Sequence, residues 1–89
     1  MTENNSAEPI YPCQFPIKVI GENSEKLAEV IIKVMSSFSE EIHPDEMSTK
    51  PSKNGKYLSI TFKIVAKSRE QIEQIYAGLN AQKEVNMVL

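Results

Sequence analysis

The sequence has few of the residues that mark secreted or membrane-bound proteins. Only one of its 89 residues is a cysteine, Cys13, so no internal disulfide can form, whereas small secreted domains usually contain several. Its apolar runs all fall short of the roughly 18 residues that a membrane helix needs. The first residues also lack the basic and apolar segments of a secretory signal. We therefore expect a cytoplasmic protein that does not associate with membranes.

Residues that perform catalysis or bind cofactors are equally scarce. The one histidine, His43, has no recognisable nucleophile as a partner. The nearby acids Asp45 and Glu46 provide no second nitrogen ligand for a metal. The three glycines stand far apart, so they form no glycine-rich phosphate loop. The sequence predicts a non-enzymatic protein without a metal or cofactor.

The composition is that of an ordinary globular domain, but its charges are unevenly distributed. Hydrophobic residues make up 40% of the chain, charged residues make up 25%, and the net charge is −2, which argues against a general affinity for nucleic acid. No acidic residue occurs between Met47 and Arg69. That stretch contains Lys50, Lys53, Lys56, Lys63 and Lys67. It is either a solvated hairpin whose lysines discourage edge pairing or a cationic patch for an acidic partner.

Hydrophobic periodicity predicts the element order βαββαβ. Two apolar stripes with helical spacing are each flanked by runs with the period-2 alternation of strands. Ser68 and Gln71 form the S-x-x-Q pattern of a capping box, and Asn54-Gly55 is typical of a type I′ hairpin turn. The predicted helices are residues 24–38 and 68–81, and the predicted strands are residues 14–21, 47–53, 56–66 and 84–89.

This order defines an α+β, ferredoxin-like fold. We expect a four-stranded antiparallel sheet with strand order 4-1-3-2 and both helices on one face. Residues 1–12 are predicted to be a disordered tail, and residues 13–89 a single domain. Pro16 and Pro51 lack an N–H, so each should lie at a sheet edge or at a position outside the hydrogen-bond ladder. Gly78, inside the second helix, predicts a close contact between helices.

The face of the sheet opposite the helices is the candidate interaction face, because polar and apolar side chains are mixed on it. Its predicted members are Lys18, Ile20, Lys50, Ser59, Thr61, Lys63, Val65 and Val88. Either a protein partner or a second copy of the chain could pair with this face or with an edge strand. Nucleic-acid binding through the lysines at positions 50, 53, 56 and 63 is an alternative. Against it, the third strand offers only Tyr57 for stacking a base.

Several segments of the sequence resemble the YbeD-like family of small bacterial proteins. They are Phe15-Pro16 to Gly21, Lys50-Pro51-Ser52 with Asn54-Gly55, Tyr57-Leu58-Ser59-Ile60, and Met87-Val88-Leu89. The similarity extends from Cys13 to Leu89, and it implies a ferredoxin-like fold close to that of ACT regulatory domains and a cytosolic location.

ACT domains bind amino acids near the loop after the first strand, so the resemblance makes Gly21, Glu22 and Asn23 a candidate ligand loop. The Asp and Pro of the usual Asp-x-Pro-Gly-x-Leu turn are absent here. The prediction is therefore a non-enzymatic regulatory or protein-interaction module. An ACT-like sensor of amino acids and a weak nucleic-acid binder are the alternatives.

Overall fold

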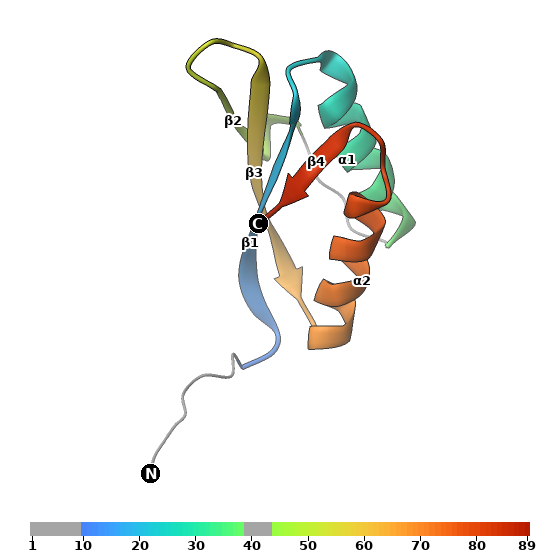
Figure 1. The fold of residues 1–89 in the computed structure, drawn as a ribbon. Helices are drawn as coiled ribbons and strands as arrows, with labels where there is room; N and C mark the ends of the chain where they lie inside the picture. Colours follow the sequence, from blue (N-terminus) through green and yellow to red (C-terminus); the bar gives the residue numbers. More distant parts are fainter. Residues whose placement is uncertain (1–9, 39–43) are drawn as a thin grey trace.

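The predicted βαββαβ order is confirmed by a computed structural model that describes residues 10–38 and 44–89. Figure 1 shows the two helices on the same side of a twisted sheet. A short 3-10 turn, η2 (Pro44–Glu46), precedes the second strand. The strands are β1 (Cys13–Glu22), β2 (Ser48–Pro51), β3 (Tyr57–Ala66) and β4 (Val85–Val88), and the helices are α1 (Glu25–Ser37) and α2 (Arg69–Asn80).

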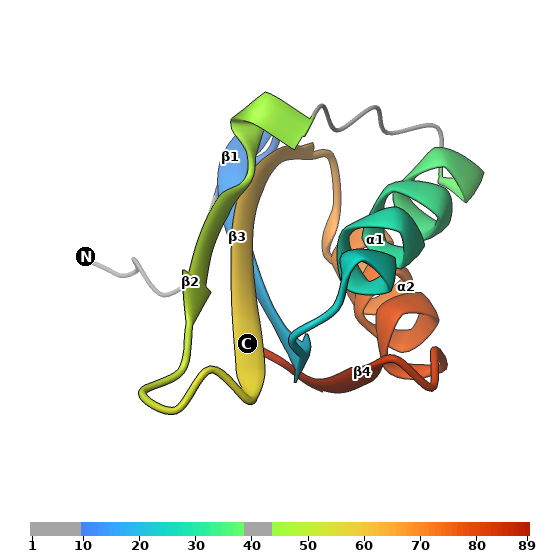
Figure 2. The ribbon, with the colours of Figure 1, turned by 90° about the horizontal axis from the view of Figure 1, so that it is seen from above.

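The sheet is antiparallel with the order β2-β3-β1-β4, which is the predicted order 4-1-3-2 read from the other edge. The two central strands pair over ten positions, from Cys13 opposite Ala66 to Glu22 opposite Tyr57. Viewed from above, α1 and α2 lie together over one face of the sheet (Figure 2). No element in the described part of the chain covers the opposite face.

One apolar layer between the sheet and the helices forms the core. Alternate residues of β1 and β3 point into this layer because side chains alternate between the two faces of a strand. The helices contribute their apolar stripes, and burial of these side chains is the main favourable term in folding. The buried side chains are Ile17, Val19, Leu27, Ile31, Val34, Met35, Ile60, Phe62, Ile64, Ala66, Ile75 and Leu79.

The ring of Phe15 meets that of Tyr76 beside this layer, with centroids 6.4 Å apart. Desolvation raises the pKa of the Tyr76 phenol above its ordinary value of 10.0, so the phenol stays neutral at physiological pH.

Both helices begin at the serines that the sequence places there. The Oγ of Ser24 accepts a hydrogen bond from the amide of Lys26, and the Oγ of Ser68 accepts one from the amide of Gln71. The side chain of Gln71 reaches back to accept from the amide of Lys67. These bonds satisfy amides that a helix N-terminus otherwise leaves without partners.

Gly78 marks a close contact between α1 and α2, as predicted. A Cβ at this position would lie 3.1 Å from a ring carbon of Phe38 and 3.3 Å from a methyl carbon of Val34. A larger side chain would therefore push the two helices apart.

The hairpin between β2 and β3 is longer than the predicted two-residue turn. The amide of Ser52 donates to the carbonyl of Tyr57, and the amide of Gly55 donates to the carbonyl of Ser52. The loop therefore spans residues 53–56, and Gly55 adopts a φ of +76°. Because the turn begins earlier, β2 ends at Pro51 instead of at residue 53.

The last strand contains a β-bulge that alternation did not predict. Val85 lies opposite Gly21 and Met87 lies opposite Ile20, so β4 advances two residues where β1 advances one. Val88 therefore lies opposite Val19 on the helix side and packs against the core. The placement of Val88 on the open face was wrong, because Asn86 is the extra residue of the bulge.

The predicted N-terminal tail lies mostly outside the described residues. Of its last positions, Ile10 is exposed and Tyr11 is partly buried against the core.

Candidate functional site

The open face of the sheet brings most of the predicted interaction residues together. Lys50 of β2 and Ile20 of β1 both lie opposite Ser59 of the strand between them. In the next row, Lys18 lies opposite Thr61. Lys63 follows two residues along β3, opposite Pro16, whereas Val65 lies near the far end of the strand, opposite Gln14, and is 50% exposed.

A hollow of about 360 Å³ opens on this face at the end near the β2–β3 hairpin, and we call it the lysine hollow. Ser59 lies at the bottom of the hollow, because its side chain is smaller than those of Lys50 and Ile20 on either side of it. The Oγ of Ser59 donates to the carbonyl of Lys50 at 3.2 Å, which holds the hydroxyl against β2. The residues lining the hollow are Lys18, Ile20, Lys50, Pro51, Ser52, Lys53, Tyr57, Leu58 and Ser59.

The hollow is positively charged although the whole chain carries a net charge of −2. Lys18, Lys50 and Lys53 line it, and no acidic side chain is among the lining residues. On the helices, by contrast, acids and bases are mixed: α1 contains Glu25, Lys26, Glu29 and Lys33, and α2 contains Arg69, Glu70 and Glu73. The lysine hollow thus differs in charge from the mixed helix face.

Hydrogen bonds order the hairpin beside the hollow. The Oδ1 of Asn54 accepts from the hydroxyl of Ser52 and from the amide of Lys56, each at 3.1 Å. The side chain of Asn23 donates to the carbonyl of Gly55 at 3.0 Å, which ties the loop to the end of β1. The ammonium of Lys56 lies 5.4 Å from the centre of the Tyr57 ring. That cation therefore already interacts with the only aromatic ring on the open face of β3.

An apolar edge adjoins the cationic part of the face, and sequence reasoning missed it. Met87 lies opposite Ile20 and is 50% exposed. Leu89 exchanges two backbone hydrogen bonds with Lys18 and is 56% exposed. Simple alternation from Val85 onward places both side chains on the core side, because it does not account for the bulge. No local sequence signal identifies Asn86 as the extra residue.

The three residues of the predicted ligand loop, Gly21, Glu22 and Asn23, lie in different surroundings. Gly21 is buried, and a Cβ there would lie 2.3 Å from the carbonyl oxygen of Glu84. The amide and the side chain of Asn23 both bond to the hairpin. Only Glu22 lines a second hollow, of about 570 Å³, between the start of α1 and the start of β4.

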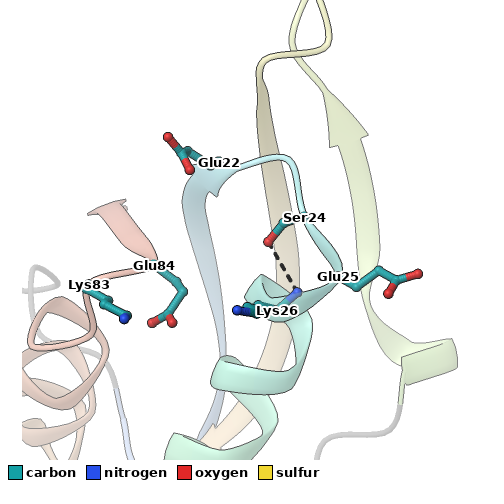
Figure 3. A pocket seen from close by; sticks show the side chains of 6 residues that line it. All are labelled: Glu22, Ser24, Glu25, Lys26, Lys83 and Glu84. Atoms are coloured by element: carbon teal, nitrogen blue, oxygen red, sulfur yellow. Dashed lines mark hydrogen bonds between the residues drawn. The ribbon is translucent and has the colours of Figure 1, made fainter.

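This second hollow, which we call the loop hollow, is drawn in Figure 3. The Oγ and the carbonyl of Ser24 already accept from the amides of Lys26 and Leu27, so those donors are not free for an anion. Glu25 points away from Lys83 and Glu84 (Figure 3). Within residues 10–38 and 44–89, no three side chains with metal-binding groups lie together.

None of the described helices is long and apolar enough to cross a membrane.

Two solved structures share this architecture. Protein HP0495 from H. pylori superposes with a TM-score of 0.76 at 18% identity and covers 100% of this chain and 96% of that one. The ACT domain from GTP pyrophosphokinase of Chlorobium tepidum gives a TM-score of 0.66 at 17% identity, over 85% and 94% of the two chains. The protein therefore has a ferredoxin-like, ACT-like fold.

The sequence comparisons identify the family. Residues 7–89 match the family model described as "Protein of unknown function (DUF493)", and the chain belongs to this family. A UPF0250 protein of Paraburkholderia phytofirmans is 38% identical over 79 residues, which cover 89% of each chain. A UPF0250 protein of Nitrosomonas europaea is 33% identical over the full length of both chains. The resemblance to the YbeD-like family is thereby confirmed.

Proposed function

We propose that this protein is a non-enzymatic interaction module whose open sheet face docks a partner protein with an acidic surface. The observation that supports this function is the lysine hollow, which is lined by Lys18, Lys50 and Lys53 without an acid. Complementary charge guides association and selects against partners of the wrong sign. The apolar edge formed by Ile20, Met87 and Leu89 supplies surface that a docked protein would remove from water.

The backbone favours docking on the face over pairing at an edge. The amide of Lys18 points toward β4, where it donates to the carbonyl of Leu89. Backbone nitrogens two residues apart in a strand point to the same side, so the nitrogen of Pro16 also points to the β4 side of the sheet, beyond the end of β4. The amide of Ser52 bonds to β3, so the nitrogen of Pro51 points toward the opposite edge. Neither proline can donate a hydrogen bond to an added strand.

The charge of the face also favours a different protein over a second copy of the chain. Two copies packed face to face would bring lysines against lysines, and like charges brought together across an interface cost free energy. A single-stranded nucleic acid would satisfy the charge, but proteins that bind such strands also provide aromatic rings on which the bases stack. The one ring available on β3, Tyr57, already contacts Lys56.

The test compares charge-reversal variants as baits in a lysate of the source organism. The double variant K18E/K50E inverts the charge of the hollow, and K33E/K67E makes the same change in charge at exposed positions that line neither hollow. We expect a protein that wild type and K33E/K67E retain and K18E/K50E loses. The same pattern should recur with that protein purified, and binding should weaken as salt rises. Retention of every partner by K18E/K50E would contradict the proposal.

A second candidate function is the sensing of a small zwitterion in the loop hollow. Its support is the volume of about 570 Å³ at the first strand–helix loop, with acids and lysines around it. A thermal-shift screen with free amino acids tests this function directly. Stabilisation by one amino acid that is lost in Glu22→Gln would support it, and no shift at millimolar concentration would exclude it.

A further inference from the structure

We infer that the lysine hollow binds a short extended segment of the partner, in which acidic residues flank one apolar residue. This inference rests on the proposed function and specifies the element that the open face recognises. Its basis is the shape of the hollow together with the positions of the charged and apolar side chains around it.

The width of the hollow selects an extended chain over a helix. Neighbouring strands lie about 4.8 Å apart, so the Cα atoms of Lys50 and Ile20 stand about 10 Å apart across Ser59. The side chains of these residues narrow the space further. A helix with its side chains is about 10–12 Å across and does not reach the floor. A single extended segment is narrower, since neighbouring strands lie only about 4.8 Å apart, and it fits between these side chains.

The charges indicate what that segment contains. Lys50 stands on the β2 side of the hollow, and Lys18 stands diagonally across it on β1. Successive side chains of an extended chain point to opposite sides. Two adjacent acidic residues of the segment can therefore reach Lys50 and Lys18 at once. Lys53 also lines the hollow, from the hairpin loop, and Lys63 extends the cationic track along β3, two residues beyond Thr61.

The apolar edge indicates that the bound segment also contains an apolar residue. Ile20 lines the hollow and lies opposite Met87, and Leu89 lies opposite Lys18 one row away. A leucine-sized side chain placed among these residues would remove apolar surface from water. The recognised sequence is therefore acidic with one apolar residue, and not uniformly acidic.

The experiment titrates isotope-labelled full-length protein with a capped peptide in which glutamates flank one leucine, and follows the amide resonances by NMR. We expect shifts at Lys18, Lys50 and Ser59, and none on α1 or α2. The counterpart peptide with glutamine in place of every glutamate should bind about tenfold more weakly or worse, since a tenfold change corresponds to about 1.4 kcal/mol. A single-stranded oligonucleotide that shifts the same resonances more strongly would contradict the inference.

Two variants separate entry into the hollow from general attraction to lysines. Ser59→Leu raises the floor without changing any charge, and we expect it to lose the peptide. Gln14→Leu, on the same face of the sheet and opposite the far end of β3, should keep the peptide. If S59L binds as wild type does, the segment does not enter the hollow and the inference fails. The proposed function still stands in that case, provided that K18E/K50E loses the partner while S59L retains it.

Discussion

At the scale of single residues, Gly21 shows how one missing side chain allows two elements to meet. It is buried at the point where β1 approaches β4. A Cβ there would lie 2.3 Å from the backbone oxygen of Glu84 and 2.8 Å from a methyl carbon of Leu27. The leucine side chain could rotate away, but the oxygen belongs to the backbone and could move only together with the start of β4.

We therefore predict that Gly21→Ala destabilises the fold by about 2–3 kcal/mol, the upper part of the range for overpacked sites. Urea unfolding at equilibrium measures the loss. Gly55→Ala is the matched control, because the same substitution there meets no atom within 4 Å and is strained only by the φ of +76°, at a cost of about 1–2 kcal/mol. A smaller loss for G21A than for G55A would show that β4 shifts freely away from Gly21.

At the scale of elements, β4 differs most between its sequence pattern and its structure. Val85, Met87 and Leu89 alternate with two other residues, which predicts that these three side chains share the core side. After Val85 the bulge exchanges the side chains that face the two sides of the sheet, so Val88 packs on the core and Met87 faces the open side.

This reversal predicts opposite outcomes for two neighbouring substitutions. Val88→Asp should destabilise the protein by more than about 2 kcal/mol, because it places a charge against the core. Met87→Asp should cost no more than about 1 kcal/mol, because that side chain is half exposed. Both variants put an aspartate in the same edge strand, so the difference in thermal midpoint reports which side of the sheet each side chain faces. A larger loss in M87D would mean that β4 follows simple alternation.

The sequence predicts those features of the fold that depend on residues close together in the chain. Leu58, Ile60 and Phe62 alternate without interruption in β3, and Ser24 and Ser68 begin their helices through bonds within one turn. These features are set by nearby residues, and the structure has them. The bulge in β4 depends on Gly21, more than 60 residues earlier in the chain, because only a residue without a Cβ admits the oxygen of Glu84 there.

The candidate site follows the same division. The face that each side chain of β1, β2 and β3 occupies follows from alternation, so the prediction that Lys18, Lys50 and Ser59 share one face is confirmed. The apolar edge depends on the bulge, so Met87 and Leu89 were missed. The lysine hollow itself depends on the neighbours of Ser59 across two strands, and no pattern within one strand shows its depth.

At the scale of the whole molecule, the two faces of the sheet carry different kinds of side chains. The helix side holds all of the buried apolar side chains that the structure describes. The open side holds the lysine hollow and the apolar edge. Substitutions on the open side can therefore alter binding while the fold persists. This independence makes the charge-reversal and hollow-filling experiments interpretable.

β3 allows the separation to be tested within one element, because Phe62 is 2% exposed and Val65 is 50% exposed. Phe62→Ala removes a large side chain from the single apolar layer and should cost about 3–5 kcal/mol. That is a large part of the 5–15 kcal/mol typical of a domain. Val65→Ala should change the free energy of unfolding by no more than about 0.5 kcal/mol. Urea denaturation of both variants gives the comparison, and equal losses would mean that the open face is also packed against something in the folded protein.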